Sequence, residues 1–269
     1  MRRRGLSLVE VLIAIVLLGI VGVGITNLLR SQMRFFARGT NARDARTVSR
    51  NALNLTRSEL RMVEPNGMVY ASTDSVVVRL PYLMGLYCAA NTAMFVPTDS
   101  LTLVQAQYGG YAYRDTLAGA SYTYVASTTA LSDGLAATCL GVGLDTIPYG
   151  PRYIVAPAIA ALAPSAPIFL WQRVTYFFAP SALVSGRTAL WRQAGSAAAE
   201  EIAVPLDAAS SFNFYTTGVS ASSTVPSPLN TMRGIEMLLF GESERTSPGQ
   251  TTPEQALQRV SIFFRNAVQ

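Results

Sequence analysis

One carboxylate stands inside a long apolar stretch near the start of the chain. The stretch runs from Leu6 to Ile25 and reads LSLVEVLIAIVLLGIVGVGI, with Glu10 as its one charged residue. A helix of about 20 residues, rising 1.5 Å per residue, just crosses a hydrocarbon layer about 30 Å thick. An ionised Glu in such a segment costs roughly 2.5–3.5 kcal/mol and therefore needs a partner. The chemistry that Glu10 offers is charge pairing in apolar surroundings.

The residues before the stretch suggest where that partner comes from. The basic residues Arg2–Arg4 are followed by Gly5. A cut after Gly5 would free the α-amino group of Leu6. In a staggered bundle of identical helices, Glu10 of one subunit could then neutralise this amine on a neighbour, which offsets the burial of both charges.

Three other interpretations of this segment compete. A secretory signal peptide would have a shorter apolar region followed by a small-residue cleavage site, whereas here the run continues to Arg30 without one. A plain membrane anchor accounts for everything except Glu10. Alternatively, Glu10 simply reaches the headgroup layer and has no pairing role.

The rest of the chain offers little for catalysis or metal binding. It contains no His, which removes the commonest general base, the His-activated Ser and Cys nucleophiles, and the commonest zinc ligand. No calcium-loop, phosphate-loop or paired-Cys motif occurs. We expect no enzymatic activity, no cofactor and no metal. Scattered carboxylates lie in turn-like contexts: Asp133, Asp145, Glu200, Glu201 and Asp207.

The positive charge of the chain is concentrated near its start. The formal net charge is +5, every basic residue is Arg, and without Arg2–Arg4 the chain is close to neutral. Charge alone therefore does not indicate a nucleic-acid partner. A second cationic cluster follows the apolar stretch: Arg30, Arg34, Arg38, Arg43, Arg46 and Arg50.

The segment Gly5–Glu10, GLSLVE, resembles the prepilin peptidase site of type IV pilins and type II secretion pseudopilins. The family pattern is a basic leader, Gly, an aromatic residue, a small polar residue, two aliphatic residues and Glu. This chain departs from it at Leu6, where Phe is usual. The resemblance implies cleavage between Gly5 and Leu6, N-methylation of Leu6 and an assembly role for Glu10.

The same resemblance implies partners and a location. Prepilin peptidase, an inner-membrane assembly platform and other pilins or pseudopilins, bound through helix bundling, are the expected partners. The unassembled protein would cross the inner membrane once with its head in the periplasm, and the assembled protein would lie in a pilus or pseudopilus filament.

The chain divides by pattern into a leader (1–5), a membrane-spanning helix (6–29), an amphipathic helix (30–65) and a β-rich head (66–269). Turn chemistry at Pro65-Asn66-Gly67 predicts the end of the helix, which would run from about Leu8 to Glu64. A stripe at three-, four- and seven-residue steps is expected to pack on the sheet of the head. Its residues are Ala45, Val48, Ala52, Leu55 and Met62, widened by Leu53 and Leu60.

Beyond this helix the patterns predict strands. A hairpin is expected from Phe169–Phe178 and Ala189–Gln193, and Pro81 is expected to halt the strand that begins at Asp74. The predicted fold class is α+β, with one long N-terminal helix on an antiparallel β-rich head, as in the pilin fold. Further expected strands are Leu101–Ala106, Ser121–Val125, Phe212–Tyr215, Gly234–Phe240 and Val260–Arg265.

Loose patterns within the head resemble the larger minor subunits, namely PilW-type minor pilins and J-type minor pseudopilins of type II secretion. They include Arg173–Tyr176, Leu190–Arg192 and Val204–Leu206 before Phe212–Tyr215. The resemblance implies a minor pilin that primes assembly at the filament tip. One alternative is a minor pseudopilin of a type II secretion system. Another is a tip module that binds DNA or a surface ligand.

Two side-chain groups in the head have open interpretations. Cys88 and Cys139 either form a disulfide, closing a loop of about 50 residues and stabilising the fold by roughly 4 kcal/mol, or remain buried thiols. Alternating tyrosines favour strand packing over a ligand-stacking surface: Tyr108, Tyr111, Tyr113, Tyr122 and Tyr124.

Overall fold

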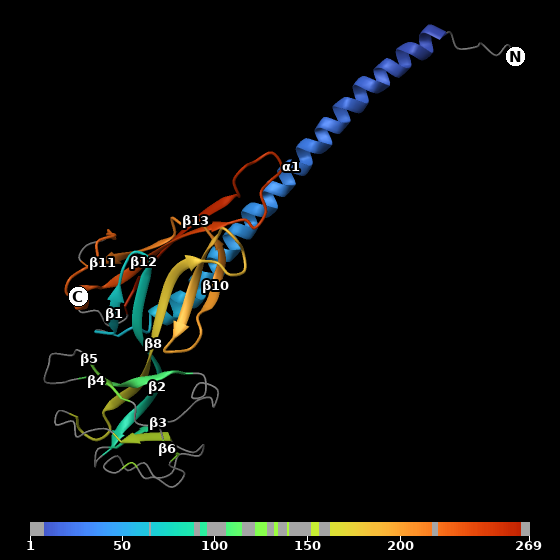
Figure 1. Ribbon diagram of the computed structural model, residues 1–269. Helices are drawn as coiled ribbons and strands as arrows, with labels where there is room; N and C mark the ends of the chain where they lie inside the picture. The colour runs from blue at the N-terminus through green and yellow to red at the C-terminus, as the bar shows by residue number, and fades with distance from the viewer. Residues whose placement is uncertain are drawn as a thin grey trace.

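The computed structural model describes residues 8–64, 66–88, 92–95, 106–114, 122–127, 132–133, 139, 152–155, 162–216 and 220–264. One long helix and one large antiparallel sheet account for most of these residues (Figure 1). This layout confirms the predicted α+β class.

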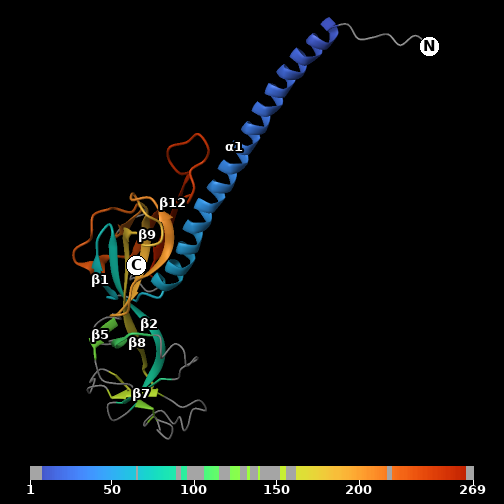
Figure 2. The same cartoon turned by 45° about the vertical axis from the view of Figure 1, so that its right-hand side comes forward.

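Helix α1 (Leu8–Leu60) is continuous over 53 residues. Its N-terminal half projects away from the rest of the molecule, and its C-terminal half lies against the sheet (Figures 1 and 2). The helix ends at Leu60, four residues before the predicted end at Glu64. The last turn tightens, because the amides of Met62 and Val63 donate to carbonyls three residues back, over 2.9 and 3.3 Å.

Within the described residues the sheet has 13 strands, and their pairings are all antiparallel. The main order is β11-β12-β10-β9-β8-β2-β3-β7-β6, with β13 beside β12, β4 beside β8 and β5, and β1 beside β2. The strands are β1 (Met68–Ala71), β2 (Ser75–Cys88), β3 (Thr92–Phe95), β4 (Tyr108–Arg114), β5 (Tyr122–Ala126), β6 (Ser132–Asp133), β7 (Arg152–Val155), β8 (Pro167–Pro180), β9 (Thr188–Ala194), β10 (Glu200–Leu206), β11 (Ser211–Tyr215), β12 (Gly234–Glu242) and β13 (Gln255–Phe263). A short 3₁₀ helix, η1 (Leu229–Thr231), precedes β12.

Strands β2 and β8, each of 14 residues, pair along most of their length and connect two separate cores. The helix-proximal core contains Leu53 and Leu60 of α1 with Val78 and Val174 of the two long strands. The distal core, around Phe95, lies beyond the C-terminal end of α1 (Figure 2). The head is therefore extended along β2 and β8, away from the free end of the helix.

Pro81 does not halt its strand, contrary to the prediction. Strand β2 continues to Cys88 because the pairing with β8 shifts register between Pro81, opposite Trp171, and Leu83, opposite Leu170. A bulge of this kind leaves one residue outside the ladder, so a residue without an amide proton is tolerated there. A similar shift in β4, between Tyr108 and Gly110, also lies opposite Trp171.

Most of the other strand predictions are confirmed. Strands β8 and β9 form the predicted hairpin, and β5, β11 and β12 lie where they were expected. The last strand, β13, starts at Gln255 rather than at Val260 and ends at Phe263. The segment predicted from Leu101 falls outside the described residues up to 105. The patterns missed five strands. Four of them, β1, β3, β6 and β7, have four residues or fewer, and β10 begins with two charged residues.

Candidate functional site

The residues of the predicted processing site lie at the edge of the described chain. Gly5 and Leu6 are outside the described residues, and the helix begins at Leu8. Glu10 is exposed in the first turn of α1. A carboxylate at this place interacts favourably with the partial positive charge at a helix N-terminus.

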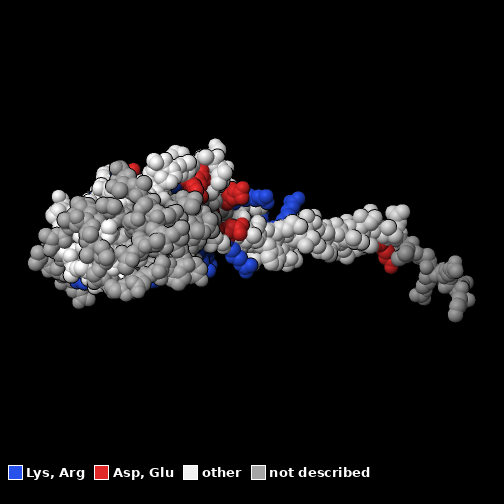
Figure 3. All heavy atoms as spheres, turned by 90° about the horizontal axis from the view of Figure 1, so that it is seen from below, with Lys and Arg blue, Asp and Glu red and all other residues white. Residues whose placement is uncertain are grey.

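The N-terminal half of α1 presents its apolar side chains to the outside. The large hydrophobic residues from Leu8 to Leu29 are each between 44% and 83% exposed. An 18-residue window within α1 has a mean hydropathy of 2.8, and none of it is buried within the protein. Figure 3 shows this projecting segment as almost uncharged, with acidic and basic side chains gathered where the helix meets the head. An apolar surface of this size needs a cover of lipid or other helices.

The C-terminal half of α1 is fixed to the sheet by a close backbone approach. Gly241 of β12 faces Ala45 and Ser49, and a Cβ at Gly241 would lie 2.2 Å from both the Ala45 carbonyl oxygen and Ser49 Oγ. Three small residues thus allow helix and strand to touch. The Ser49 hydroxyl is fully buried and donates to the carbonyl of Ala45 over 3.1 Å, which satisfies it inside the core.

The buried face of α1 differs from the predicted stripe. Ala45, Ala52, Leu53 and Leu60 are buried as expected, but Leu55 is 42% and Met62 44% exposed. Two polar residues, Ser49 and Thr56, are buried on this face of the helix instead. Thr56 donates its hydroxyl to the carbonyl of Ala52 over 2.7 Å, so its burial leaves no polar group unsatisfied.

An ion pair holds the end of α1 to the β8–β9 hairpin. Glu59 accepts two hydrogen bonds from Arg192 of β9, from Nε and Nη2, each 3.0 Å long. The hydroxyl of Tyr176 on β8 also donates to Glu59. Both charged side chains are less than one-fifth exposed. Sequence patterns did not predict this contact, because it joins positions far apart in the chain.

The loop between β12 and β13, residues 243–254, lies along α1 on the side of the head from which the apolar half of the helix projects (Figure 1). Asn41 donates from Nδ2 to the carbonyl of Arg245 over 3.1 Å and to the hydroxyl of Ser247 over 3.0 Å. The loop is ordered by its own bonds, including one from the amide of Ser243 to the carbonyl of Glu254 over 2.9 Å. The head is therefore hydrogen-bonded to the helix at Asn41 as well as at Glu59.

Cys88 and Cys139 form a disulfide, with their Cα atoms 5.1 Å apart. Both residues are 1% exposed and pack with Met94. The bond closes a loop of 51 residues in the distal half of the head. It therefore restrains the part of the molecule that lies farthest from α1.

The tyrosines of the distal half pack against neighbouring strands, as the predicted strand packing requires. Tyr124 of β5 lies edge-on to Trp171, with ring centroids 6.1 Å apart. The guanidinium of Arg79 lies 5.0 Å from the ring centroid of Tyr124 and 5.4 Å from that of Trp171. Burial, and secondarily the negative charge of Glu64, raises the pKa of Tyr124 well above its usual value.

Two of the carboxylates named from the sequence, Glu201 and Asp207, accept hydrogen bonds from neighbouring groups, and Glu200 is exposed at the start of β10. Glu201 accepts from the hydroxyl of Ser181 over 2.9 Å and from the amide of Ala182. Asp207 accepts from the amide of Ala209 over 2.8 Å. The side chain of Asp133 and all of Asp145 lie outside the described parts. Within the residues that the structure describes, no three His, Cys, Asp or Glu side chains gather as metal ligands.

Residues 1–26 match the family model described as the prokaryotic N-terminal methylation motif. The chain starts with a prepilin-type motif. Neither a curated protein nor a solved structure gave a significant match to the chain. Together with the exposed apolar helix, the prepilin-type motif supports a type IV pilin-like precursor that prepilin peptidase processes and that is anchored in a membrane by one helix.

Proposed function

We propose that this protein is a minor subunit of a type IV pilus. Prepilin peptidase cuts after Gly5, the new N-terminus at Leu6 is methylated, and α1 joins a bundle with the helices of other pilins. The proposal rests on one observation: a single uninterrupted helix has an exposed apolar half and a half that is fixed to the head. Because the helix is continuous, its position in a bundle also determines the position of the head.

Glu10 is the residue that selects the position of the helix in the bundle. Its carboxylate lies in the first turn of α1, one turn from the amine that cleavage would create at Leu6. A neighbouring helix that is shifted along the bundle axis brings its Glu10 beside this amine. Pairing of the two charges stabilises one axial offset between neighbouring helices. Other offsets are destabilised, because either charge alone is costly in apolar surroundings.

The shape of the head favours a place at the filament tip. If the helices are bundled with their N-termini toward the membrane, the distal ends of β2 and β8 point away from it (Figure 1). A subunit stacked above would meet the distal half, which extends beyond the end of α1. At the tip no such subunit follows, so the protein can start a filament on the assembly platform and remain at its end.

Intact-mass analysis of protein extracted from cells with active prepilin peptidase tests processing. We expect the mass of a chain that starts at Leu6 and carries one added methyl group. An N-terminus at Met1 or Arg2 would refute the proposal.

The assembly role is tested with Glu10→Ala, with Glu10→Asp as the matched control that keeps the charge. Glu10→Ala should be cleaved normally and be depleted from sheared filaments, whereas Glu10→Asp should keep part of its incorporation. Normal incorporation of Glu10→Ala would exclude the pairing role. Deletion of the protein should reduce surface pili; loss of protein secretion with pili unchanged would instead identify a type II secretion pseudopilin.

A further inference from the structure

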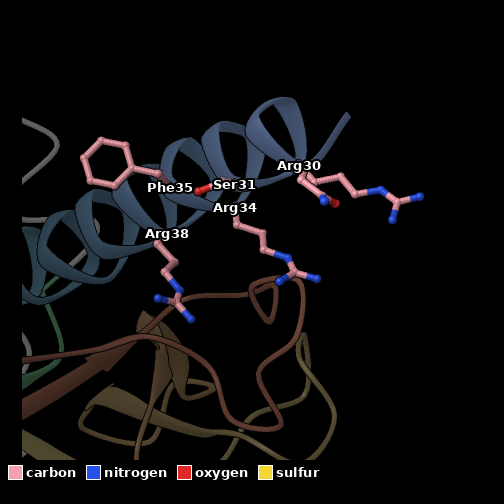
Figure 4. Close-up of a pocket in the computed structure, with 6 residues that line it drawn as sticks. Arg30, Ser31, Arg34, Phe35 and Arg38 are labelled. Carbon is pink, nitrogen blue, oxygen red and sulfur yellow. The ribbon is translucent and has the colours of Figure 1, made fainter. Parts of the chain in front are cut away.

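Three arginines follow the apolar half of α1 on one face of the helix. Arg30, Arg34 and Arg38 are spaced four residues apart, which places each about 40° around the helix from the one before. With Asn27, Ser31 and Phe35 they line an open hollow of about 440 Å³. In Figure 4, Arg34 and Arg38 reach toward the loop of residues 243–254, and Arg30 extends toward the N-terminal side.

The length of the apolar run fixes where this hollow lies relative to a membrane. Leu29 is the last apolar residue before Arg30, four residues beyond the strictly apolar stretch that ends at Ile25. A hydrocarbon layer about 30 Å thick that covers the 20 residues before Arg30, from Glu10 to Leu29, ends at Arg30. Arg34 lies about 6 Å farther along the axis, within a headgroup layer about 5–8 Å thick on each side. The first two arginines thus coincide with the phosphates of the lipid headgroups.

The three arginines differ in their charge partners. Arg38 faces Glu254 with 4.0 Å between Nε and Oε1, so the third arginine has a carboxylate nearby. Within the described residues, neither Arg30 nor Arg34 forms an ion pair with a carboxylate. Arg34 instead lies beside the turn of the loop, where a Cβ at Gly249 would be 4.0 Å from its Cζ.

The side chains around the hollow have the chemistry of a phosphate site at a membrane surface. A guanidinium group donates two parallel hydrogen bonds to phosphate oxygens, and Asn27 and Ser31 add neutral donors on the same hollow. Phe35 and Phe36, one and two residues beyond Arg34, are 74% and 68% exposed. Exposed aromatic side chains are typical of the headgroup level of a membrane.

We propose that Arg30 and Arg34 bind the phosphate of an anionic phospholipid where α1 leaves the membrane. The lipid fixes the depth and rotation of the unassembled subunit, with the head held above the surface by the loop of residues 243–254. Incorporation of the helix into a filament then requires release of this lipid. The inference depends on membrane insertion and is independent of the filament type.

The test is native mass spectrometry of the processed full chain in detergent micelles, titrated with phosphatidylglycerol. Phosphatidylcholine and inorganic phosphate are the comparison ligands. The double variant Arg30→Gln/Arg34→Gln should weaken binding of phosphatidylglycerol about 30-fold. The matched control is Arg46→Gln/Arg50→Gln, which removes the same charge from exposed positions about 24 Å farther along the helix and should keep binding within about twofold of the unmodified chain.

Three outcomes would overturn the proposal. The first is unchanged binding in Arg30→Gln/Arg34→Gln, and the second is an equal loss in both double variants, which would indicate unspecific attraction. The third is competition by equimolar inorganic phosphate, which would indicate a site for free anions rather than for lipid. The altered side chains are exposed, so unchanged circular dichroism and melting of the head are expected, and a loss of binding with an intact fold supports the site.

Discussion

Glu59, one residue before the end of α1, accepts hydrogen bonds from both Nε and Nη2 of Arg192, each over 3.0 Å. This two-point geometry fixes the relative orientation of the helix end and the β9 strand, because a planar guanidinium matches a carboxylate in one arrangement. Together with the packing of α1 on β10, β12 and β13, the contact helps to fix the orientation of the helix on the head.

Replacement of Glu59 by Gln should destabilise the head by about 1–3 kcal/mol, because Arg192 keeps its charge in a largely buried place and loses its partner. The value lies below that of a fully buried pair, since both side chains remain partly exposed. Urea unfolding of the full chain in detergent, followed by tryptophan fluorescence, measures it. Glu244→Gln, at an exposed position, should change stability little; equal losses in the two variants would argue against a role for the pair.

Gly241→Ala should lower stability by about 1–3 kcal/mol, because the new methyl group would meet the backbone of α1 at Ala45. The matched control is Gly39→Ala. No atom outside the local helix lies within 4 Å of a Cβ at Gly39, so alanine there should stabilise the helix by up to about 1 kcal/mol. Opposite shifts in melting temperature are expected, and an unchanged melting temperature for Gly241→Ala would contradict the close approach.

Removal of the disulfide by Cys88→Ala/Cys139→Ala should cost about 4 kcal/mol, the loop-closure entropy of about 50 residues. The loss should be confined to the distal half, since the bond lies outside the core that contains α1. Hydrogen exchange measured by mass spectrometry should show faster exchange around β3 and unchanged protection of β12. Alkylation of both cysteines in the native, unreduced protein would show that the bond is absent.

Alkaline pH should unfold the protein. Burial raises the pKa of Tyr124, Tyr82 and Tyr111 in the folded state, whereas tyrosines of the unfolded chain ionise near pH 10. Above about pH 10 the unfolded chain has therefore lost protons that the folded chain keeps, and stability falls as pH rises. The stabilisation is fully present below about pH 10. Tyrosinate absorbance and circular dichroism should change together in a cooperative transition; ionisation of all tyrosines without unfolding would contradict this loss of stability at high pH.

Two tyrosines should respond in opposite directions to loss of the hydroxyl. The Tyr124 hydroxyl is buried with no hydrogen-bond partner among the described residues, so Tyr124→Phe should stabilise by up to about 1 kcal/mol. The Tyr215 hydroxyl donates to Glu236 over 3.2 Å and bonds to Ser261 over 2.8 Å. Tyr215→Phe should therefore destabilise by about 1–3 kcal/mol. Denaturant midpoints of the two variants provide the comparison.

The elements that depend on local pattern were predictable from the sequence. The continuous helix follows from its apolar first half, and the β8–β9 hairpin from alternating residues around Ser185-Gly186-Arg187. The helix end and the continuation of β2 through Pro81 were not predictable. Each depends on backbone bonding that the pattern does not show, namely a tightened last turn in one case and a bulge opposite β8 in the other.

The buried face of α1 shows a second limit of prediction from the sequence. Hydrophobic periodicity ranks Leu55 and Met62 above Ser49 and Thr56, yet the latter two are buried. Backbone carbonyls of the helix satisfy both hydroxyls, and Gly241 selects a small residue at position 49.

For the candidate site too, the sequence predicted local features and missed contacts between distant residues. The motif at Gly5–Glu10 was recognisable because all of its residues are neighbours in the sequence. The contact between Glu59 and Arg192 was not, because its partners are 133 residues apart and only the folded sheet brings them together.

The attachment of α1 at Asn41 and at Glu59 has a mechanical consequence. The two contacts lie about 27 Å apart along the helix, and the sheet follows the helix between them. If α1 is held in a bundle, as proposed, a pull on the head has a component along the helix axis. It strains the contacts of α1 with the sheet together, in shear, instead of peeling them apart one after another. Such an attachment resists tension far better than a helix joined to its head at one end.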